Sequence, residues 1–167
     1  MEAKIDTTSP RFSPEALAKA EEIFKRYPPE HREAALMPIL HLAQREFGGW
    51  LAPEAIEYVA GFMKLAPIRV YEVASFYTMY NLKKVGKYHI QVCTNISCWL
   101  CQSDAIVRAL ERRLQIKVGE TTGDGRFTLV EVECLGACVN APMLQINDDY
   151  HENLTPEKVV GLIDQLP

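Results

Sequence analysis

The residues with the clearest chemical potential are five cysteines, all of which lie in the second half of a 167-residue chain. They form two short loops with the spacings C-x4-C-x2-C and C-x3-C, at Cys93, Cys98, Cys101, Cys134 and Cys138. In an intracellular chain, thiols grouped in this way favour a metal centre over a framework of disulfides. Small residues in the second loop, Gly136 and Ala137, let backbone N–H groups approach sulfur atoms.

Four thiolates in two pairs suit a [2Fe–2S] cluster, because each iron then takes one pair. A structural zinc ion is an alternative, since Cys98 and Cys101 form a C-x2-C knuckle. The same two thiols could act as a redox dithiol. Spacing also leaves the ligand set open between Cys93/Cys98 with Cys134/Cys138 and a plant-type ferredoxin set, Cys93-x4-Cys98-x2-Cys101 with one distant cysteine.

Strand patterns place these cysteines at the ends of strands, and therefore in loops at one edge of a sheet. Alternating residues at 88–92 predict a strand that runs into Cys93, and a second strand over 127–133 ends at Cys134. Ser103 and Thr155 are predicted to cap the two helices of this half, and further strands are expected at 143–146 and near Tyr150. This order of elements predicts a small α/β sandwich.

The first half has no pattern of catalytic residues and is expected to be a small bundle of four helices. We expect the second helix to begin near Glu30 and to be kinked at Pro38, whose ring clashes with the preceding turn. The fourth helix is predicted to begin at Pro67 and to hold an aromatic stretch that either packs in the core or anchors a partner protein. That stretch comprises Tyr71, Phe76, Tyr77 and Tyr80. We divide the sequence into a helical module, residues 1–85, and an α/β domain, residues 86–167.

Composition excludes several classes of function. The net charge is −4, and no stripe of Lys and Arg is present to neutralise phosphates, which argues against a nucleic-acid binder. No apolar run approaches the roughly 18–20 residues that a membrane span needs. The first 14 residues lack the features of a signal or transit peptide, so we expect a cytoplasmic protein. A G-x-G-x-x-G fingerprint and a P-loop, which would bind nucleotides, are also missing. If the cysteines hold an iron–sulfur cluster, the protein therefore needs a partner protein that binds the substrate.

Three stretches resemble a known family: VASFYTMY at 73–80, VCTNISC at 92–98 and ECLGACVNAP at 133–142. They are similar to the thioredoxin-like [2Fe–2S] subunits of NADH–quinone oxidoreductase, which is respiratory complex I. The resemblance covers nearly the whole sequence from about Phe12. It implies an α+β protein in which a small N-terminal helical bundle precedes a thioredoxin-like α/β domain that carries a [2Fe–2S] cluster.

The resemblance also implies a ligand set and a set of partners. Cys93, Cys98, Cys134 and Cys138 would hold one cluster, and Cys101 would be an extra thiol. The protein would exchange one electron with the flavin of a partner subunit, which alone binds FMN and NADH, near the large Fe–S subunit of the same peripheral arm. That arm lies on the cytoplasmic side of the inner membrane, or on the matrix side in a eukaryote. An equivalent subunit of an NAD-linked hydrogenase or formate dehydrogenase is the alternative.

Two further expectations concern the surroundings of the thiols. The acidic excess of the sequence falls in residues 86–167, which hold 7 basic and 11 acidic residues. Because a thiolate-bound cluster is anionic, nearby carboxylates should give it a low reduction potential; the candidates are Glu131, Glu133, Asp148 and Asp149. Since thioredoxin folds place a cis proline beside the redox site, Pro142 is a candidate for a cis bond, with a trans, strand-opening proline as the alternative.

Overall fold

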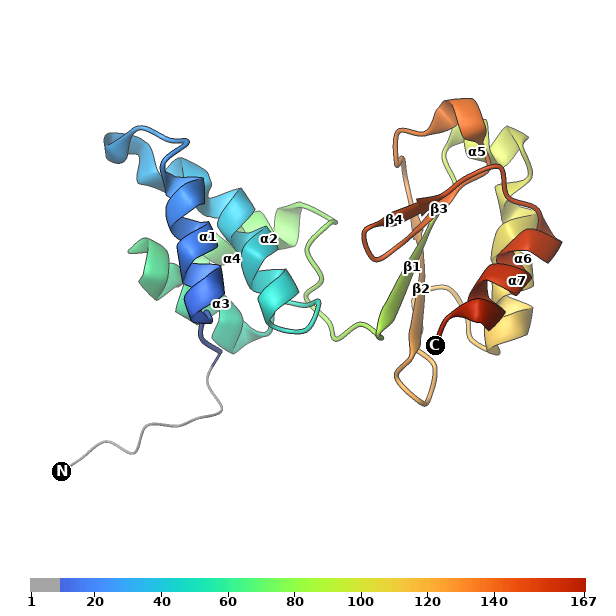
Figure 1. Ribbon diagram of the computed structural model, residues 1–167, viewed down its shortest axis with the longest axis horizontal. Helices are drawn as coiled ribbons and strands as arrows, with labels where there is room; N and C mark the ends of the chain where they lie inside the picture. The colour runs from blue at the N-terminus through green and yellow to red at the C-terminus, as the bar shows by residue number, and fades with distance from the viewer. Residues whose placement is uncertain (1–9) are drawn as a thin grey trace. The chain divides into compact units, whose positions relative to one another are not determined.

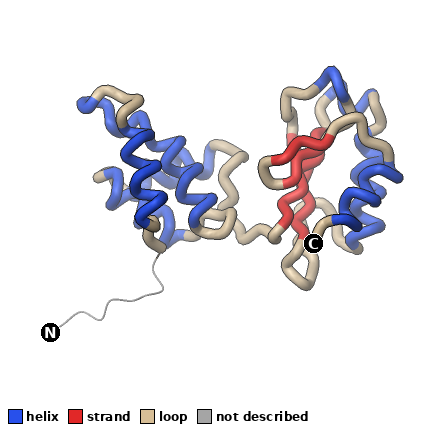
Figure 2. Tube along the Cα trace, in the orientation of Figure 1, coloured by secondary structure: helices blue, strands red, loops and turns tan. Residues whose placement is uncertain are grey.

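The structure, a computed structural model that describes residues 10–167, divides into two compact units, one ending at Lys84 and the next beginning at Val85. The first is helical, and the second combines a sheet with helices, which confirms the expected α+β class (Figures 1 and 2). Each unit has its own cluster of buried apolar side chains. None of the helices in residues 10–167 has the length and apolar character needed to cross a bilayer.

The first unit holds four α-helices and one 3-10 helix. Ser13 begins the first helix as expected, because its side chain accepts a hydrogen bond of 3.2 Å from the N–H of Ala16. Proline occupies the first position of three of the α-helices, where its missing N–H costs nothing. The elements are α1 (Pro14–Phe24), η1 (Pro29–Ala35), α2 (Leu36–Glu46), α3 (Pro53–Met63) and α4 (Pro67–Phe76).

Two expectations for this unit are wrong. The segment from Pro29 to Ala35 is a 3-10 helix, and α2 begins only at Leu36. Pro38 therefore lies in the first turn of α2, where the backbone N–H has no helical partner in any case, and it produces no kink in the middle of a helix. The fourth helix ends at Phe76, so Tyr77 and Tyr80 lie beyond it.

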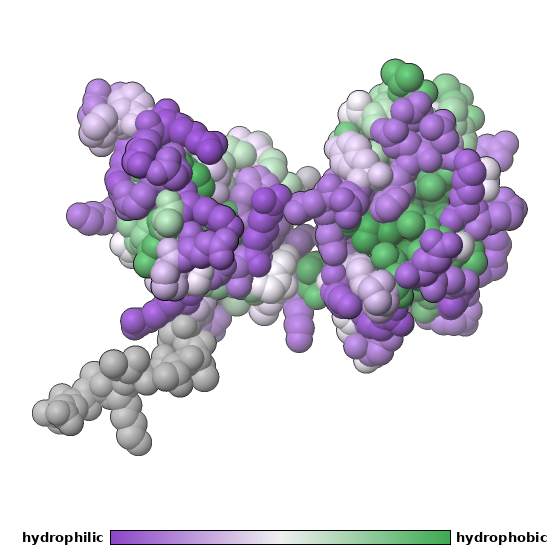
Figure 3. Space-filling view, in the orientation of Figure 1, coloured by the Kyte–Doolittle hydropathy of each residue, from purple (hydrophilic) through white to green (hydrophobic). Residues whose placement is uncertain are grey.

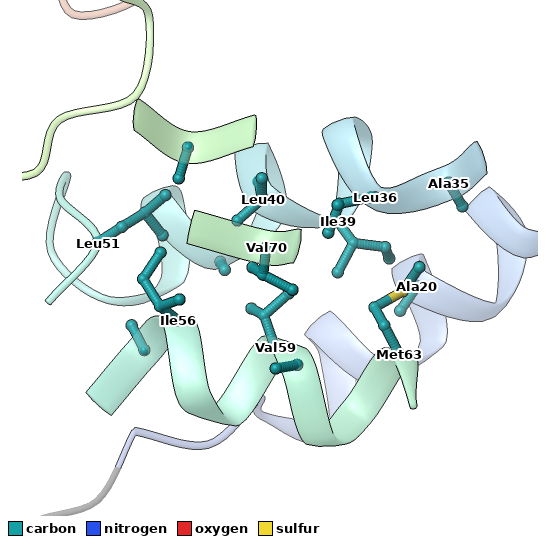
Figure 4. Close-up of a cluster of buried hydrophobic side chains, with 14 of the residues drawn as sticks. Ala20, Ala35, Leu36, Ile39, Leu40, Leu51, Ile56, Val59, Met63 and Val70 are labelled. Atoms are coloured by element: carbon teal, nitrogen blue, oxygen red, sulfur yellow. The ribbon is translucent and has the colours of Figure 1, made fainter. Parts of the chain in front are cut away.

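The core of the helical unit is formed by side chains from all four α-helices (Figure 4). Ile39, Leu40 and Val59 are completely buried in it. Leu51, from the segment between α2 and α3, and Val70 of α4 complete the same cluster. Burial of this apolar surface is the main source of stability for the unit.

The aromatic stretch at the end of this unit is divided between the core and the surface. Tyr80 is buried, and its hydroxyl donates a hydrogen bond of 2.9 Å to the carbonyl of Met37. Tyr71 and Phe76 are exposed, Phe76 by 77% of its surface. One ring therefore belongs to the core, while others form an apolar surface that is available to a partner.

The second unit is a four-stranded mixed sheet with two helices packed against it. The strands follow the order β2-β1-β3-β4; β1 and β2 are parallel, and the pairs β1–β3 and β3–β4 are antiparallel. Side chains of α6 and α7 share the apolar core with the sheet. The elements are β1 (Tyr88–Cys93), α5 (Ile96–Leu100), α6 (Ser103–Leu114), β2 (Phe127–Val132), η2 (Cys138–Asn140), β3 (Leu144–Ile146), β4 (Asp149–His151) and α7 (Pro156–Gln165).

Most of the sequence-based expectations for this unit are confirmed, including the short strand around Tyr150. Thr155 caps α7, because its side chain accepts from the N–H of Lys158. Ser103 differs from expectation. It is the first residue of α6 and does not cap it; Gln102 holds the N-cap position with a left-handed backbone and makes no capping bond through its side chain.

The sheet has two distinct ends. Because β1 and β2 are parallel and Cys93 pairs with Val132, both strands finish at the same edge, and the cysteine loops leave from there. The turn between β3 and β4 lies at the opposite end, since the N–H of Asn147 donates to the carbonyl of His89 near the start of β1. We call the first of these the cysteine edge.

Candidate metal centre

Cys93 and Cys98 form a buried pair at the cysteine edge. Cys93 is the last residue of β1 and is 3% exposed; Cys98 lies in α5 and is 2% exposed. The two thiols share a side-chain hydrogen bond. The thiol of Cys93 also lies 3.5 Å from the carbonyl of Glu133, which it can reach as a donor. Two sulfur atoms are therefore held together, away from water.

Met143 closes this pair from the side of β3. Its carbonyl accepts a hydrogen bond of 3.2 Å from the N–H of Cys93, and its own N–H donates to the sulfur of Cys98. The side chain of Met143 is 1% exposed and packs with both cysteines. The preceding bond, Ala141–Pro142, is cis, which is the first of the two alternatives considered for Pro142.

The electrostatic surroundings of Cys98 disfavour an isolated thiolate. Burial first, and then the neighbouring thiols of Cys93 and Cys138, raise the pKa of the Cys98 thiol to about 11, although the N–H of Met143 acts in the opposite direction. A bound metal cation reverses this balance, because it pairs the negative charge of the sulfur. The donor set thus fits a group that brings positive charge to this edge.

The second cysteine loop is held in place by polar contacts from β4 and the residue after it. Gly136, between the two cysteines of the loop, has a φ of +81°, a conformation that glycine adopts without steric cost. The hydroxyl of Tyr150 donates a hydrogen bond of 2.7 Å to the carbonyl of Leu135. Farther along, the side-chain amide of Asn140 donates to the carboxylate of Glu152, also at 2.7 Å. The loop is therefore positioned by strand β4 as well as by its own residues.

The cysteines differ in how closely the structure gathers them. Cys138 lies near enough to Cys98 to influence its pKa, while Cys134, Cys138 and Cys101 are all exposed. Across residues 10–167, no three His, Cys, Asp or Glu side chains converge as the ligands of a single metal ion would. The buried pair beside a separate cysteine loop has the pairwise form that a two-iron cluster uses.

The carboxylates expected near the site divide between the two ends of the sheet. Glu131 pairs with Val92, next to Cys93, and Glu133 follows β2, so both lie at the cysteine edge. Asp148 and Asp149 lie at the β3–β4 turn, at the other end, so their inclusion around the cluster is wrong. The error has a physical cause. Strand β3 runs antiparallel to β1, so the turn after it lies far from the cysteines, and the sequence pattern does not show in which direction β3 runs.

Sequence reasoning missed two residues that the fold brings to this edge. Glu152 follows β4 back to the cysteine edge, where it accepts the hydrogen bond from Asn140. Tyr150 reaches Leu135, fifteen positions earlier in the sequence. Neither has a local signal, because each depends on the antiparallel return of β4.

An apolar surface surrounds the thiols. Three side chains of α5 and one of η2 are strongly exposed: Ile96, Trp99, Leu100 and Val139, the last by 97%. In Figure 3, apolar residues gather at the end of the second unit where Figure 1 shows α5 and η2. Exposed apolar groups of this size, next to a candidate metal centre, are typical of a surface that another protein covers.

Comparisons with known proteins identify the family of this chain. Residues 20–167 match the family described as thioredoxin-like [2Fe-2S] ferredoxin. A subunit of NADH-quinone oxidoreductase from Rickettsia conorii is 58% identical over 155 residues, which are 93% of each protein. The mitochondrial NADH dehydrogenase [ubiquinone] flavoprotein 2 of Dictyostelium discoideum is 52% identical over 93% of this protein and 63% of its own length.

Among solved structures, an NAD+-reducing [NiFe]-hydrogenase in the H2-reduced state is similar in fold. Its TM-score is 0.70 at 24% identity, and the match covers 79% of this protein and 23% of that one. At this identity the likeness extends to the fold alone.

Proposed function

Because the chain belongs to the thioredoxin-like [2Fe–2S] ferredoxin family, we propose that Cys93, Cys98, Cys134 and Cys138 hold one [2Fe–2S] cluster in a subunit of NADH–quinone oxidoreductase. Its role there is electron transfer, as the [2Fe–2S]-carrying member of an oxidoreductase complex. The observation that carries this proposal is 58% identity, over 93% of both proteins, with the Rickettsia conorii subunit of that oxidoreductase. The protein acts as a subunit and offers no nucleotide-binding fingerprint of its own.

The buried pair at the end of β1 supports the choice of ligands. A bound [2Fe–2S] cluster supplies a centre that accepts and returns one electron at a time. Cys93 and Cys98 are buried, so their sulfur atoms are shielded from water, and the N–H of Met143 donates to the sulfur of Cys98. Cys101 stands outside the set that the family resemblance implies; it lies on the turn between α5 and α6 and is exposed, as Cys134 and Cys138 also are.

The charges at the cysteine edge favour a low reduction potential. Hydrogen bonds to sulfur stabilise the reduced, more negative state, whereas carboxylates destabilise it. Three carboxylates lie at this edge, those of Glu131, Glu133 and Glu152. We therefore expect a value in the negative part of the range of roughly −700 to +450 mV that iron–sulfur centres span.

A flavoprotein partner is the natural occupant of the apolar surface around the thiols. FMN and NADH belong to the partner, and electrons cross only where two centres approach closely, so the surface nearest the thiols is the place for contact. The side chains of Ile96, Trp99 and Val139 provide that surface. We propose direct contact with the flavin- and NADH-binding subunit, and a place beside the large Fe–S subunit. We also propose that the complex holds this protein on the cytoplasmic side of the inner membrane, or on the matrix side in a mitochondrion.

The test is the iron and acid-labile sulfide content of the purified protein, together with its EPR spectrum after reduction. We expect about two irons and two sulfides per molecule, as one cluster on four cysteines requires, and a signal that appears only on reduction. A colourless protein that contains one zinc ion overturns the proposal. Purification of the intact complex decides between hosts, since an NAD-linked hydrogenase or formate dehydrogenase would bring its own catalytic subunit with it.

A further inference from the structure

Ser103 is a buried polar residue that the proposed function does not yet use. It is the first residue of α6 and is only 1% exposed. Of the buried side-chain nitrogen and oxygen atoms in residues 10–167, its Oγ alone has no hydrogen-bond partner. A buried hydroxyl without a partner costs stability, so its presence here calls for a group that the protein atoms do not supply.

The position of α6 places Ser103 at the cysteine edge. Ile106 and Leu110 of this helix pack in the same core cluster as Ile90 and Val92 of β1. The helix begins only ten positions after Cys93, and α5, which carries Cys98, lies between them. Figure 1 shows α5 at the end of the second unit from which α6 starts. The first turn of α6 therefore lies at the end of the unit where β1 finishes and where α5 carries Cys98.

The N-terminus of α6 is also without a side-chain cap. Gln102 occupies the N-cap position with a φ of +66° and makes no capping hydrogen bond through its side chain. The N–H of Ala105 donates to the carbonyl of Gln102 at 2.9 Å, and the N–H groups of the first turn carry the positive end of the helix dipole. An anion beside such an end is stabilised, and a thiolate-bound cluster is anionic. The orphaned hydroxyl and the uncapped helix thus point to the same kind of ligand.

We propose that the hydroxyl of Ser103 donates a hydrogen bond to a sulfur atom of the iron–sulfur centre, at the positive end of α6. This inference rests on the proposed function, because it requires the cluster at the cysteine edge. Ser103 is a positioning residue: it donates to the centre but carries no iron. Its hydrogen bond strengthens when the centre gains negative charge, so it favours the reduced form and raises the reduction potential.

The experiment compares Ser103→Ala with the wild-type full-length protein, both loaded with the cluster, by redox titration followed by EPR. We expect the equilibrium constant for one-electron reduction to fall about fivefold to tenfold in the variant; a tenfold fall is about 59 mV for one electron. Ser103→Thr keeps the hydroxyl and should restore the wild-type potential. Ser75→Ala, a substitution of an exposed serine of α4 in the other unit, is the control and should leave the potential unchanged.

A purely structural Ser103 gives a different result. Removal of an orphaned buried hydroxyl would then raise the melting temperature of Ser103→Ala and leave its potential and EPR spectrum as in the wild type, which overturns the inference. A wild-type protein without iron contradicts the proposed function instead. A wild-type protein that holds the cluster, with an unshifted Ser103→Ala, contradicts the role of Ser103 alone.

Discussion

The two units are stabilised in different ways. In the helical unit, helices that follow one another along the sequence bury one continuous apolar core, with Ile39, Leu40 and Val59 at its centre. In the second unit a similar core lies beneath the sheet, but the cysteine edge is assembled from three distant segments that meet through a few polar contacts. The comparison teaches that apolar packing dominates in one unit, whereas we expect the cysteine edge of the other to depend also on the group that it binds.

The largest expected effect follows the removal of one thiol, which should alter the second unit and leave the first unchanged. Cys98→Ser should abolish cluster binding, because its sulfur is one of the buried pair and the serine hydroxyl is a poor ligand for iron. Iron and labile sulfide content, with the visible absorption, measure the loss. The helical unit should unfold at an unchanged denaturant concentration.

Cys101→Ser is the matched control for that variant. Cys101, on the turn after α5, is not one of the four proposed ligands, so we expect the iron content and the EPR signal of the variant to equal those of the wild type. Loss of iron from Cys101→Ser would move this thiol into the ligand set and break the assignment of the pair Cys134 and Cys138.

Truncation of a core residue should affect each unit by itself. Leu40→Ala should cost the helical unit about 2–5 kcal/mol of unfolding free energy, because the residue is completely buried. Each unit has one tryptophan, Trp50 in the first and Trp99 in the second, so denaturant unfolding followed in a Trp99→Phe background reports the first unit. Leu110→Ala, at an equally buried site of α6, should leave that transition unchanged and accelerate iron loss instead. Equal effects of both variants on both probes would show that the units unfold as one.

The stability of the two units should depend on pH in opposite ways. In each unit the main cause is the burial of one titratable side chain, which shifts its pKa. Burial raises the pKa of Tyr80 to about 12, so the neutral phenol is favoured in the folded helical unit, whose stability is complete below about pH 10 and is lost as the pH rises towards 12. Burial lowers the pKa of His89, so the second unit is most stable above about pH 6.5 and loses stability below it.

Unfolding across both pH ranges, with the two tryptophans as separate probes, checks these opposite trends. The alkaline loss should amount to at most about 3 kcal/mol, from a shift of about two pKa units. Tyr80→Phe should remove the alkaline trend, and His89→Gln should flatten the acidic one. An alkaline trend that persists in Tyr80→Phe would assign it to another group.

The smallest effect concerns the second cysteine loop. Tyr150→Phe removes the hydrogen bond to the carbonyl of Leu135, which is worth about 1 kcal/mol, and leaves the ring in place. We expect the loop to open more often, so that a chelator removes iron a few times faster while the iron content at the start is normal. Tyr71→Phe, on the exposed face of α4, is the control and should not alter the rate. An unchanged rate for Tyr150→Phe would show that the ligands alone hold the loop.

Local patterns predicted the elements of the fold well. The strand that runs into Cys93, the cap at Thr155 and the short strand at Tyr150 all follow from residues within one element. The errors arose where the conformation of a residue depends on segments outside its own element. Pro38 is harmless because the segment before it is a 3-10 helix, and Tyr80 lies beyond α4 because its ring is used in the core.

Sequence patterns nominated candidate ligands for the site, but they predicted less of its surroundings. The spacing of the cysteines, with the resemblance of the loops around Cys93 and Cys134, nominated the thiols. The contributions of Tyr150, Glu152 and Ser103 depend on which way β3, β4 and α6 run, and so does the position of Asp148 at the far end of the sheet. Such directions are set by tertiary pairing, which no short pattern records.

The antiparallel pairing of β1 with β3 has a consequence for the order of events during synthesis. A protein leaves the ribosome N-terminus first, so the helical unit can fold while the second is still being made. Cys93 and Cys98 appear early, but Met143 and Tyr150, which close the site around them, come about fifty residues later. During that interval the two thiols are accessible to oxidants and to metal ions. Because the other two proposed ligands, Cys134 and Cys138, also come later in the sequence, we expect iron and sulfide to be delivered only after the second cysteine loop has been made.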